Sequence, residues 1–565
     1  MPADVFRHVR AERGFRLRCK GWKQESLLRM LENNLENAED PSRLIVYGGI
    51  AKAARNWESY HAIVDVLKNL EDDETLAIQA GMPVAIFRTH RLAPRVVMAL
   101  SNVIQADWPT FYDLMDRNLT TFSSYTAGPW EYIGSQGVVE GTFETLACIA
   151  DNRWNGDLAG RIFFTAGLGG MGRSQPRAMT MHGGVSVTVE VRKDVVEQRL
   201  RDGWVDVEAD DLASAIELSR KAAEAREPLS IVLCGNMVDV CEEALSKGWF
   251  PDIVTEMCPF HDPFAVIPSG LSPERAAGVR AQSRANYLEY ARESIKRIVG
   301  AMNRFRDHGC EVFEFGTFAR KEAFDAGMDR EEAFGYSGFV SAYWRPQIFE
   351  LGRGPFRWTC ISGSTADRDR LDDLALEMFP ECPVTQRWIP LARKHLPVEG
   401  LPARVCFLGF GQRKDFALAV NRLVGLGDVE GPIAFSRDNL DAGSIANPAM
   451  ETETMKDGSD AISDWPFLNA LLNTAAMADL VSIQANGTMG VSHHTGVTII
   501  ADGTAESAMR IEAAMTTDGG IGIVRYAQSG YDTARRVAEG KGPLTSDTIK
   551  VPLWWSEHAT FGPEG

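Results

Sequence analysis

The sequence predicts an α/β fold of two or more domains, from two patterns and the length of the chain. From about residue 160, short apolar runs at 162–165, 185–189 and 229–233 alternate with helical stretches, and the alternation resumes at 405–408. Such alternation is typical of a parallel sheet whose strands are joined by helices. A glycine-rich segment follows the first run, as in the first turn of a doubly wound sheet. The 565 residues are too many for one ordinary hydrophobic core.

Outside that region the periodicity predicts several helices and one long loop. The segment 22–37 has leucines three and four residues apart, which share one helix face. These are Leu27, Leu28, Leu31 and Leu35. A Gly-Gly turn at 48–49 precedes a second helix through 57–67. Residues 126–137 predict a loop with short strands, and residues 273–306 predict a long helix or helix pair.

Composition and charge favour a globular protein with a small-molecule partner. Apolar residues make up 45% of the chain and charged residues 24%. No run of about 20 apolar residues is present, so no membrane partner is expected. The net charge of −18 disfavours nucleic acid. The charged N-terminus lacks the apolar core of a secretion signal, and the nine cysteines form no C-x-x-C pair. These features predict a cytoplasmic protein without a structural metal.

The strongest local motif predicts a dinucleotide site. Gly167, Gly169 and Gly172 fit G-x-G-x-x-G after an apolar strand, and the next strand ends in Glu190. Such glycines let backbone N–H groups approach a pyrophosphate at a helix N-terminus, and the acidic residue binds ribose hydroxyls, which favours NAD over NADP. The alternative is a glycine-rich turn that packs a strand on a helix without a ligand. The motif alone suggests a dehydrogenase.

Segments along nearly the whole chain are similar to the urocanase (urocanate hydratase) family. They are CKGW at 19–22, YGGIAKAARNWESYHAIV at 47–64, FRTHRLAPRV at 87–96, TAGPWEYIGSQGVVEGTFET at 126–145, TAGLGGMG at 165–172, GPFRW at 354–358, GLPARVCFLGFG at 400–411 and ETETMKDGSDAISDWPFLNALLNT at 451–474. The resemblance implies a homodimer whose core domain, at 1–145 and 346–565, is interrupted by an inserted Rossmann-like NAD-binding domain at 146–345. It also implies a hydro-lyase that adds water to an imidazole acrylate, with tightly bound NAD⁺ as an electrophile and no net redox change.

The resemblance carries several NAD contacts onto this chain. The implied set is Gly48, Gly49, Gln136, Gly170, Met171, Gly172, Glu190, Asn236, Met237, His261 and Gly487. Val195 stands where the family has an arginine, which predicts the loss of one phosphate or ribose contact.

Candidate catalytic residues also follow from the resemblance, and each has a structural alternative. Cys406 matches the family's assigned active-site cysteine and is expected near NAD, and the alternative is a small core residue on a buried strand without direct chemistry. Arg357 suits a substrate carboxylate, or a structural salt bridge. Asp438 and Asp441 offer a carboxylate for the proton of the attacking water, or a turn cap. Tyr47 contacts the ligand, or fills the core with a satisfied hydroxyl.

Adjacent histidines occur near the C-terminal end of the chain. His493 and His494 would point to opposite faces of an extended segment, so they are not expected to form a metal pair.

Several positions depart from the family pattern near the expected pocket. The family's HHGGGVGMGFSQH is here QANGTMGVSHH, with Gln484 and Ala485 at the two leading histidines; RDHLD has become RDNLD at Asn439; and Met450 replaces an arginine. The family's QTSAHDP reads MCPFHDP at 257–263.

These changes predict a softer, more apolar pocket with Met450 and Gln484 at the substrate. They favour a sulfur-substituted substrate such as S-methylthio-urocanate or thiourocanate, with ordinary urocanate as the alternative. A dehydrogenase and a non-catalytic NAD-binding protein are the competing classes.

Overall fold

The chain folds into two compact units, one inserted into the other. The computed structural model describes residues 8–104, 107–485 and 492–541. Unit 1 comprises residues 1–137 and 345–565, and unit 2 comprises residues 138–344. The chain therefore passes from unit 1 to unit 2 after Gly137, at the start of a helix, and it returns to unit 1 after Trp344.

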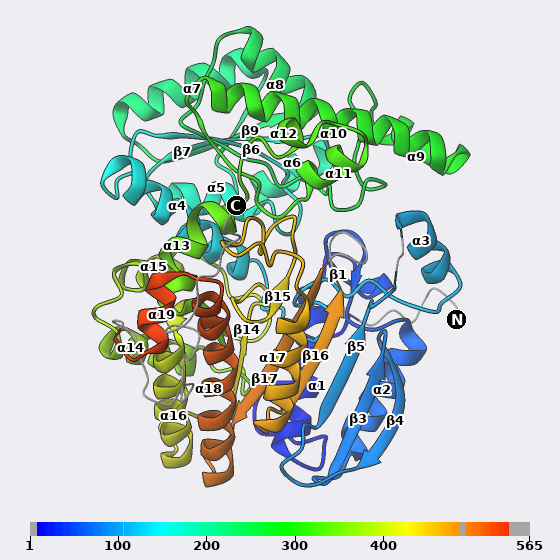
Figure 1. Ribbon diagram of the computed structural model, residues 1–565, viewed down its shortest axis with the longest axis vertical. Coiled ribbons are helices and arrows are strands. Elements are labelled where there is room, and N and C mark those ends of the chain that lie inside the picture. Colours follow the sequence, from blue (N-terminus) through cyan, green and yellow to red (C-terminus); the bar gives the residue numbers. More distant parts are fainter. Residues whose placement is uncertain (1–7, 105–106, 486–491, 542–565) are drawn as a thin grey trace. The chain divides into compact units, whose positions relative to one another are not determined.

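Unit 2 is built on a six-stranded sheet in which every pairing is parallel, as the α/β prediction requires (Figure 1). The strand order is β11-β10-β6-β7-β9-β8. Its strands are β6 (Ile162–Ala166), β7 (Val185–Glu190), β8 (Val207–Ala209), β9 (Leu229–Cys234), β10 (Ile253–Val254) and β11 (Glu311–Val312). All residues of β7 are buried, as expected for a central parallel strand.

Helices connect the strands of unit 2, and side-chain caps fix several of their starts. They are α4 (Gln136–Trp154), α5 (Ser174–Met181), α6 (Lys193–Arg201), α7 (Leu212–Ala225), α8 (Met237–Ser246), α9 (Pro273–Gln282), α10 (Arg284–Asp307), α11 (Ala319–Asp325), α12 (Arg330–Ala333) and the π-helix η3 (Val340–Trp344). The stretch 273–306 is a helix pair because Ser283 is extended and caps α10 by accepting from Asn286 N (3.2 Å). This confirms the helix-pair form of the prediction.

Unit 1 contains a nine-stranded mixed sheet with the order β13-β12-β14-β17-β16-β5-β3-β4, to which β15 adds beside β17. The strands are β3 (Glu74–Gln79), β4 (Met82–Arg88), β5 (Val96–Leu100), β12 (Arg353–Cys360), β13 (Ala403–Gly409), β14 (Ile433–Arg437), β15 (Ile445–Ala446), β16 (Leu480–Ala485) and β17 (His493–Ala501). A separate two-stranded sheet consists of β1 (Ile45–Tyr47) and β2 (Ala51–Lys52). Most pairings are antiparallel, and β5 is parallel to both β3 and β16.

The prediction of a parallel sheet in the C-terminal third is therefore wrong for the strands that are hydrogen-bonded to each other. Strand β12 lies between β13 and β14 and is antiparallel to both, so β13 and β14 run parallel to each other. The local strand–helix–strand pattern was correct, but an earlier strand occupies the gap between its two strands. Sequence alternation cannot reveal such an insertion, because it reports only neighbours along the chain.

The helices of unit 1 pack on this sheet and on one another. Figure 1 shows α16 and α18 side by side and α17 in front of β16 and β17. The elements are α1 (Trp22–Glu36), η2 (Pro41–Arg43), α2 (Trp57–Asn69), α3 (Trp108–Asp116), α13 (Arg345–Gln347), η4 (Phe349–Leu351), α14 (Thr365–Met378), α15 (Pro383–His395), α16 (Phe410–Leu426), α17 (Asp464–Ala475), α18 (Ala505–Gln528) and α19 (Asp532–Ala538). The two predicted N-terminal helices are confirmed. In α1, polar side chains are buried as well as the leucines.

The segment 126–135 is a loop without the predicted short strands, and residues 136–137 already belong to α4. Its backbone groups are satisfied by turns, such as Glu131 N to Thr126 O (2.9 Å), and by the side chain of Asn34, which accepts from Tyr132 N (3.1 Å). Because these partners replace a strand ladder, the loop is buried without being a sheet edge.

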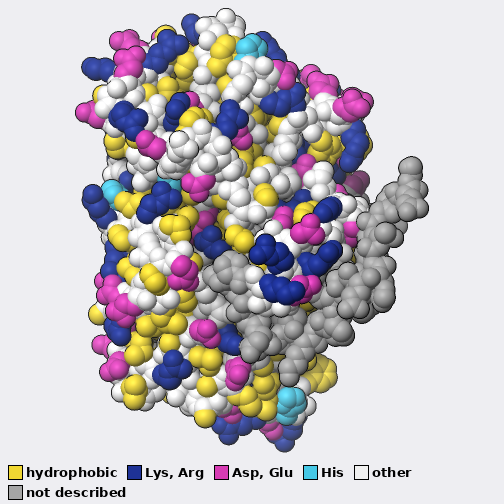
Figure 2. Space-filling view, turned by 60° about the vertical axis from the view of Figure 1, so that its left-hand side comes forward, with side chains coloured by type: hydrophobic (Ala, Val, Ile, Leu, Met, Phe, Trp, Pro, Cys, Tyr) yellow, Lys and Arg dark blue, Asp and Glu magenta, His cyan; other side chains and the backbone are white. Residues whose placement is uncertain are grey.

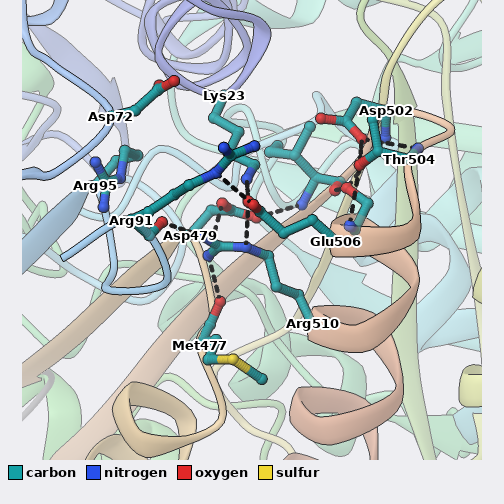
Figure 3. Close-up of polar contacts among 12 residues, drawn as sticks. Lys23, Asp72, Arg91, Arg95, Met477, Asp479, Asp502, Thr504, Glu506 and Arg510 are labelled. Carbon is teal, nitrogen blue, oxygen red and sulfur yellow. Dashed lines mark hydrogen bonds and ion pairs between the residues drawn. The ribbon is translucent and has the colours of Figure 1, made fainter.

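An ion-pair network holds one end of the unit 1 sheet (Figure 3). Glu506 of α18 pairs with Lys23 of α1 and with Arg91 (2.6 Å). Arg510 pairs with Asp479 (3.4 Å) and donates to Met477 O (2.8 Å). Asp479 precedes β16, so this network lies at the opposite end of β16 from Gln484.

The described surface carries charges of both signs. Figure 2 shows acidic and basic side chains interspersed over the visible face. Across the described ranges, no helix is both long and apolar enough to cross a membrane. All nine cysteines are free thiols.

Candidate active site and dinucleotide site

The glycine motif of unit 2 forms a tight turn that only glycine fits at two positions. Gly167 has a φ of +88°, and a Cβ there would lie 2.4 Å from Met257 O. A Cβ on Gly172 would lie 2.3 Å from Gly167 O. A Cβ on Gly169 would meet nothing within 4 Å, so this backbone stands open. That is the arrangement in which a dinucleotide pyrophosphate approaches the middle glycine.

Glu190 lies at the carboxyl end of β7 and is bonded to the glycine loop. Its carboxylate accepts from Leu168 N (2.7 Å) and from Arg192 N (3.0 Å). A carboxylate has about four acceptor positions, so ribose hydroxyls can share the same oxygens. Arg177 and Arg173 stack over Trp204, and no side chain caps α5 at Arg173. The residues therefore fit an NAD-type ligand at the start of α5.

The strand order of unit 2 marks the place where a doubly wound sheet binds its ligand. The chain proceeds from β6 to one side of the sheet and returns at β10 on the other side, so the strand order reverses between β6 and β10. Ligands of doubly wound sheets bind outside the carboxyl ends of the strands at such a point. The Gly167 loop and the segment 255–261 border it, and this segment contains Met257, Cys258 and His261.

A buried carboxyl group at the same point was not anticipated from the sequence. Glu256 follows β10, accepts from Thr317 Oγ1 and accepts from Cys258 N (2.8 Å). Burial raises the pKa of Glu256 to about 8. Its position two residues after an apolar strand end was the only sequence signal that could have indicated it.

Asn236 has a structural role that is compatible with ligand contact. It caps α8 by accepting from Val238 N (3.0 Å) and donates to Ile267 O (2.9 Å). The neighbouring Met237 is buried. Asn236 therefore fixes the loop after β9 beside the carboxyl end of the sheet.

In unit 1, Arg357 of β12 pairs with Asp438, which follows β14. Arg357 Nη1 also donates to Glu131 O (3.0 Å), and Arg357 is 3% exposed. A Cβ on Gly137 would come within 2.9 Å of Arg357 Nη2, so a larger residue there would have to displace the guanidinium. The Asp438 side chain is 19% exposed, which makes it the accessible member of the pair.

Tyr47 lies in the same unit, with its hydroxyl engaged by the loop 124–126. The hydroxyl donates to Ser124 O (2.9 Å) and accepts from Thr126 N (3.0 Å). Burial raises the pKa of Tyr47 to about 12, and the negative charge of Asp438 adds to the rise. Tyr47 therefore remains a phenol at neutral pH.

The family assignment rests on matches along almost the whole chain. The urocanase N-terminal domain matches residues 9–131, the urocanase Rossmann-like domain matches residues 134–343, and the urocanase C-terminal domain matches residues 347–540. The chain belongs to the urocanase family. The family implies a hydro-lyase of the urocanate hydratase type, and its Rossmann-like domain is consistent with NAD binding.

Two of the candidate catalytic residues of this urocanase-family chain are buried without access to solvent. Cys406 is 0% exposed on β13, in register with Phe356 of β12. Asp441 accepts two bonds from Arg413 (2.5 and 3.2 Å). The two bonds from Arg413 favour the structural interpretation of Asp441, whereas direct chemistry at Cys406 stays a prediction.

The residues expected at the substrate from the departures are also buried. Met450 is 1% exposed and Gln484 is 0% exposed, and Gln484 Nε2 donates to Tyr125 O (2.6 Å). His493 and His494 lie on β17, where His493 is half-buried and His494 is buried. Contact of Met450 and Gln484 with the substrate stays a prediction.

Of the remaining implied NAD contacts, Gly170 and Met171 lie in the turn before α5 of unit 2, and the others lie in unit 1 or outside the described residues. Gly48 and Gly49 form the predicted turn with positive φ values of +62° and +77°. Gln136 starts α4 and donates to Ala403 O (3.1 Å). Gly487 lies outside the described residues.

Proposed function

We propose that this protein is an NAD⁺-dependent hydratase that adds water to a urocanate-type imidazole acrylate. The observation that carries the proposal is the Arg357–Asp438 pair in a chain that matches all three urocanase domains. Bound NAD⁺ would supply an electron-poor ring that activates the imidazole toward water. The cradle at Gly169 and Gly172, with Glu190 beside it, would hold the cofactor.

Three side chains of unit 1 take the other roles. Arg357 would bind the substrate carboxylate, because a guanidinium can hold a carboxylate through two parallel hydrogen bonds. Asp438, as the more exposed partner, would accept the proton of the attacking water. Tyr47, whose hydroxyl already donates to Ser124 O, would orient the ligand as a hydrogen-bond acceptor.

For the substrate, we propose a sulfur-substituted urocanate such as S-methylthio-urocanate or thiourocanate. Met257 and Cys258 lie beside the glycine turn of unit 2, and Met450 occupies a position where the family pattern has a basic residue. Thioether and thiol groups are polarizable and adapt to a bulky apolar substituent. Ordinary urocanate, which gives imidazolonepropionate, is the alternative substrate.

We also propose a homodimer in the cytoplasm. The nine free thiols suit a reducing compartment. Sedimentation of the purified protein would show the oligomeric state directly.

The decisive test uses the protein as isolated with urocanate and, separately, with S-methylthio-urocanate. Loss of the ultraviolet band of the conjugated acrylate reports hydration, and absorbance of reduced nicotinamide reports redox chemistry. Faster loss with the sulfur compound and no NADH supports the proposal, whereas faster loss with urocanate selects the alternative. Accumulating NADH would indicate a dehydrogenase, and no reaction with either compound would refute the hydratase.

A substitution tests the carboxylate role separately. Arg357→Ala should weaken binding of the acrylate by at least tenfold, because a charge-assisted bidentate pair is lost. Arg88→Ala serves as the matched control, because the Arg88 side chain on β4 of the same sheet is 74% exposed, and it should keep wild-type affinity. Unchanged affinity in Arg357→Ala would refute the assignment.

A further inference from the structure

A buried polar layer underlies the Arg357–Asp438 pair in unit 1. Gln484 of β16 and His494 of β17 are register partners, and both are wholly buried. The ring of His494 stacks on Tyr125, with centroids 4.9 Å apart. A buried polar layer needs partners for its donors and acceptors, and each polar group in it calls for a physical reason.

The layer is joined by a chain of hydrogen bonds from Gln484 to Glu131. With the Asn439 amide oriented by its neighbours, its oxygen accepts from Gln484 Nε2 (2.9 Å) and from Gly496 N (3.2 Å). Its nitrogen then donates to Glu131 Oε2 (2.9 Å). The other carboxyl oxygen, Glu131 Oε1, is buried and has no hydrogen-bond partner in the described structure. Gly496 leaves room for it, because a Cβ there would come within 2.9 Å of Oε1.

Glu131 bonds Arg357 directly and is linked to Asp438 only through Asn439. Its backbone carbonyl accepts from Arg357 Nη1 (3.0 Å). Its carboxyl group holds Asn439, whose backbone directly follows Asp438. We propose that Glu131 is a positioning residue, which sets the geometry of Arg357 through its carbonyl and that of Asp438 through Asn439. This inference rests on the proposed hydratase function, in which that pair acts.

The surroundings of Glu131 indicate which protonation form of its carboxyl group holds Asn439. Burial raises the pKa of Glu131 well above its usual range, and the positive charges of Arg437 and Arg357 only partly oppose the rise. Asp438 and Asp518 add to the rise as like charges. Burial thus favours the neutral carboxyl form, which a glutamine mimics most closely, because it also offers a carbonyl oxygen to Asn439.

The expected result separates two variants. Glu131→Gln should keep kcat within about threefold of wild type, because the bond from Asn439 Nδ2 remains. Glu131→Ala should lower kcat by about tenfold or more, the factor that corresponds to about 1.4 kcal/mol, with a smaller change in KM and with wild-type NAD content. Equal losses in both variants, or no loss in Glu131→Ala, would overturn the inference.

A second variant keeps the inference testable if Glu131→Ala does not fold. A second measurement keeps it testable if the proposed function is wrong. Asn439→Ala breaks the same chain and should reproduce the loss, and the double variant should add little to it. Hydrogen exchange of peptides that cover 437–444 should rise in Glu131→Ala and stay at wild-type level in Glu131→Gln. If wild type hydrates neither acrylate, the proposed function fails, whereas the exchange result still decides the role of Glu131: unchanged exchange in Glu131→Ala would refute it.

Discussion

Substitution of Gly169 by alanine should remove the cofactor while leaving the empty protein intact. The Cβ of an alanine at this position would meet nothing within 4 Å, and the backbone does not adopt a positive φ. We therefore expect the free energy of unfolding of the NAD-free protein to change by no more than about 0.5 kcal/mol. A pyrophosphate drawn close to this backbone would instead meet the new methyl group.

The magnitude follows from the bonds that the methyl group would displace. A backbone N–H bond to a charged group contributes roughly 1.5–3 kcal/mol. Loss of one such bond predicts an affinity for NAD⁺ that is about 10- to 150-fold weaker. Gly167→Ala is the contrasting variant. Its φ of +88° and its 2.4 Å approach to Met257 O predict a loss of at least about 2 kcal/mol in the apoprotein itself, since the left-handed backbone alone costs roughly 1–2 kcal/mol.

The assay measures NAD released by acid per protomer, and then unfolding by urea after the cofactor has been removed from every variant. Removal is necessary because a bound ligand raises apparent stability by mass action. Gly169→Ala should lose NAD without losing stability, and Gly167→Ala should lose both. Wild-type NAD content in Gly169→Ala would refute the assignment of the cradle, and instability of its apoprotein would refute the open space at Gly169.

Three further substitutions test other parts of the molecule. Glu190→Ala should lower NAD affinity at least tenfold and reduce the preference for NAD over NADP in titrations of the apoprotein, since its carboxylate is the group expected at the ribose; an unchanged preference would contradict this. Burial of Asp518 opposes its ionisation, but Arg437 outweighs it and lowers the Asp518 pKa to about 2. Ionised Asp518 therefore contributes roughly 2 kcal/mol above about pH 4, lost as the pH falls toward 2, and Asp518→Asn should lack this acid dependence in urea unfolding; an identical pH profile would contradict it. Arg510→Met should lower stability by roughly 3–5 kcal/mol by leaving a buried carboxylate unpaired, yet keep kcat in the folded fraction.

The sequence predicted the elements of unit 2 better than the sheet of unit 1. Short apolar runs bounded by glycine turns gave β6, β7 and β9, because a parallel sheet covered by helices buries whole strands. In unit 1, β12 lies between β13 and β14, a pairing that no local pattern encodes. The segment 126–137 was also predicted imperfectly, because the side chain of Asn34, far away in sequence, satisfies a backbone donor there.

The candidate site, like the fold, could be predicted from the sequence only in part. The glycine motif and Glu190 carry their chemistry in local spacing, and the structure places them together. Glu131 gave no local signal, since a single glutamate in an aromatic loop does not reveal its burial. Its role depends on Asn439, which lies some three hundred residues later in the chain.

Asn439 and Gln484 are buried, so these two departures from the family pattern are expected to affect substrate preference indirectly. Both stand where the family pattern has histidine, yet both are wholly buried and bonded to each other (2.9 Å), beneath the Arg357–Asp438 pair. Their effect on the substrate must therefore pass through the geometry of the pair. We expect Asn439→His and Gln484→His to couple in a double-mutant cycle by about 1–2 kcal/mol, measured as kcat/KM for urocanate against S-methylthio-urocanate.

Each single substitution leaves one partner of a buried hydrogen bond mismatched, whereas the double variant replaces both partners at once. The double variant should therefore recover activity that either single variant loses, and should shift preference toward urocanate. Additive effects of the two substitutions would show that the positions act independently, and the preference would then have to be sought at Met257, Cys258 and Met450.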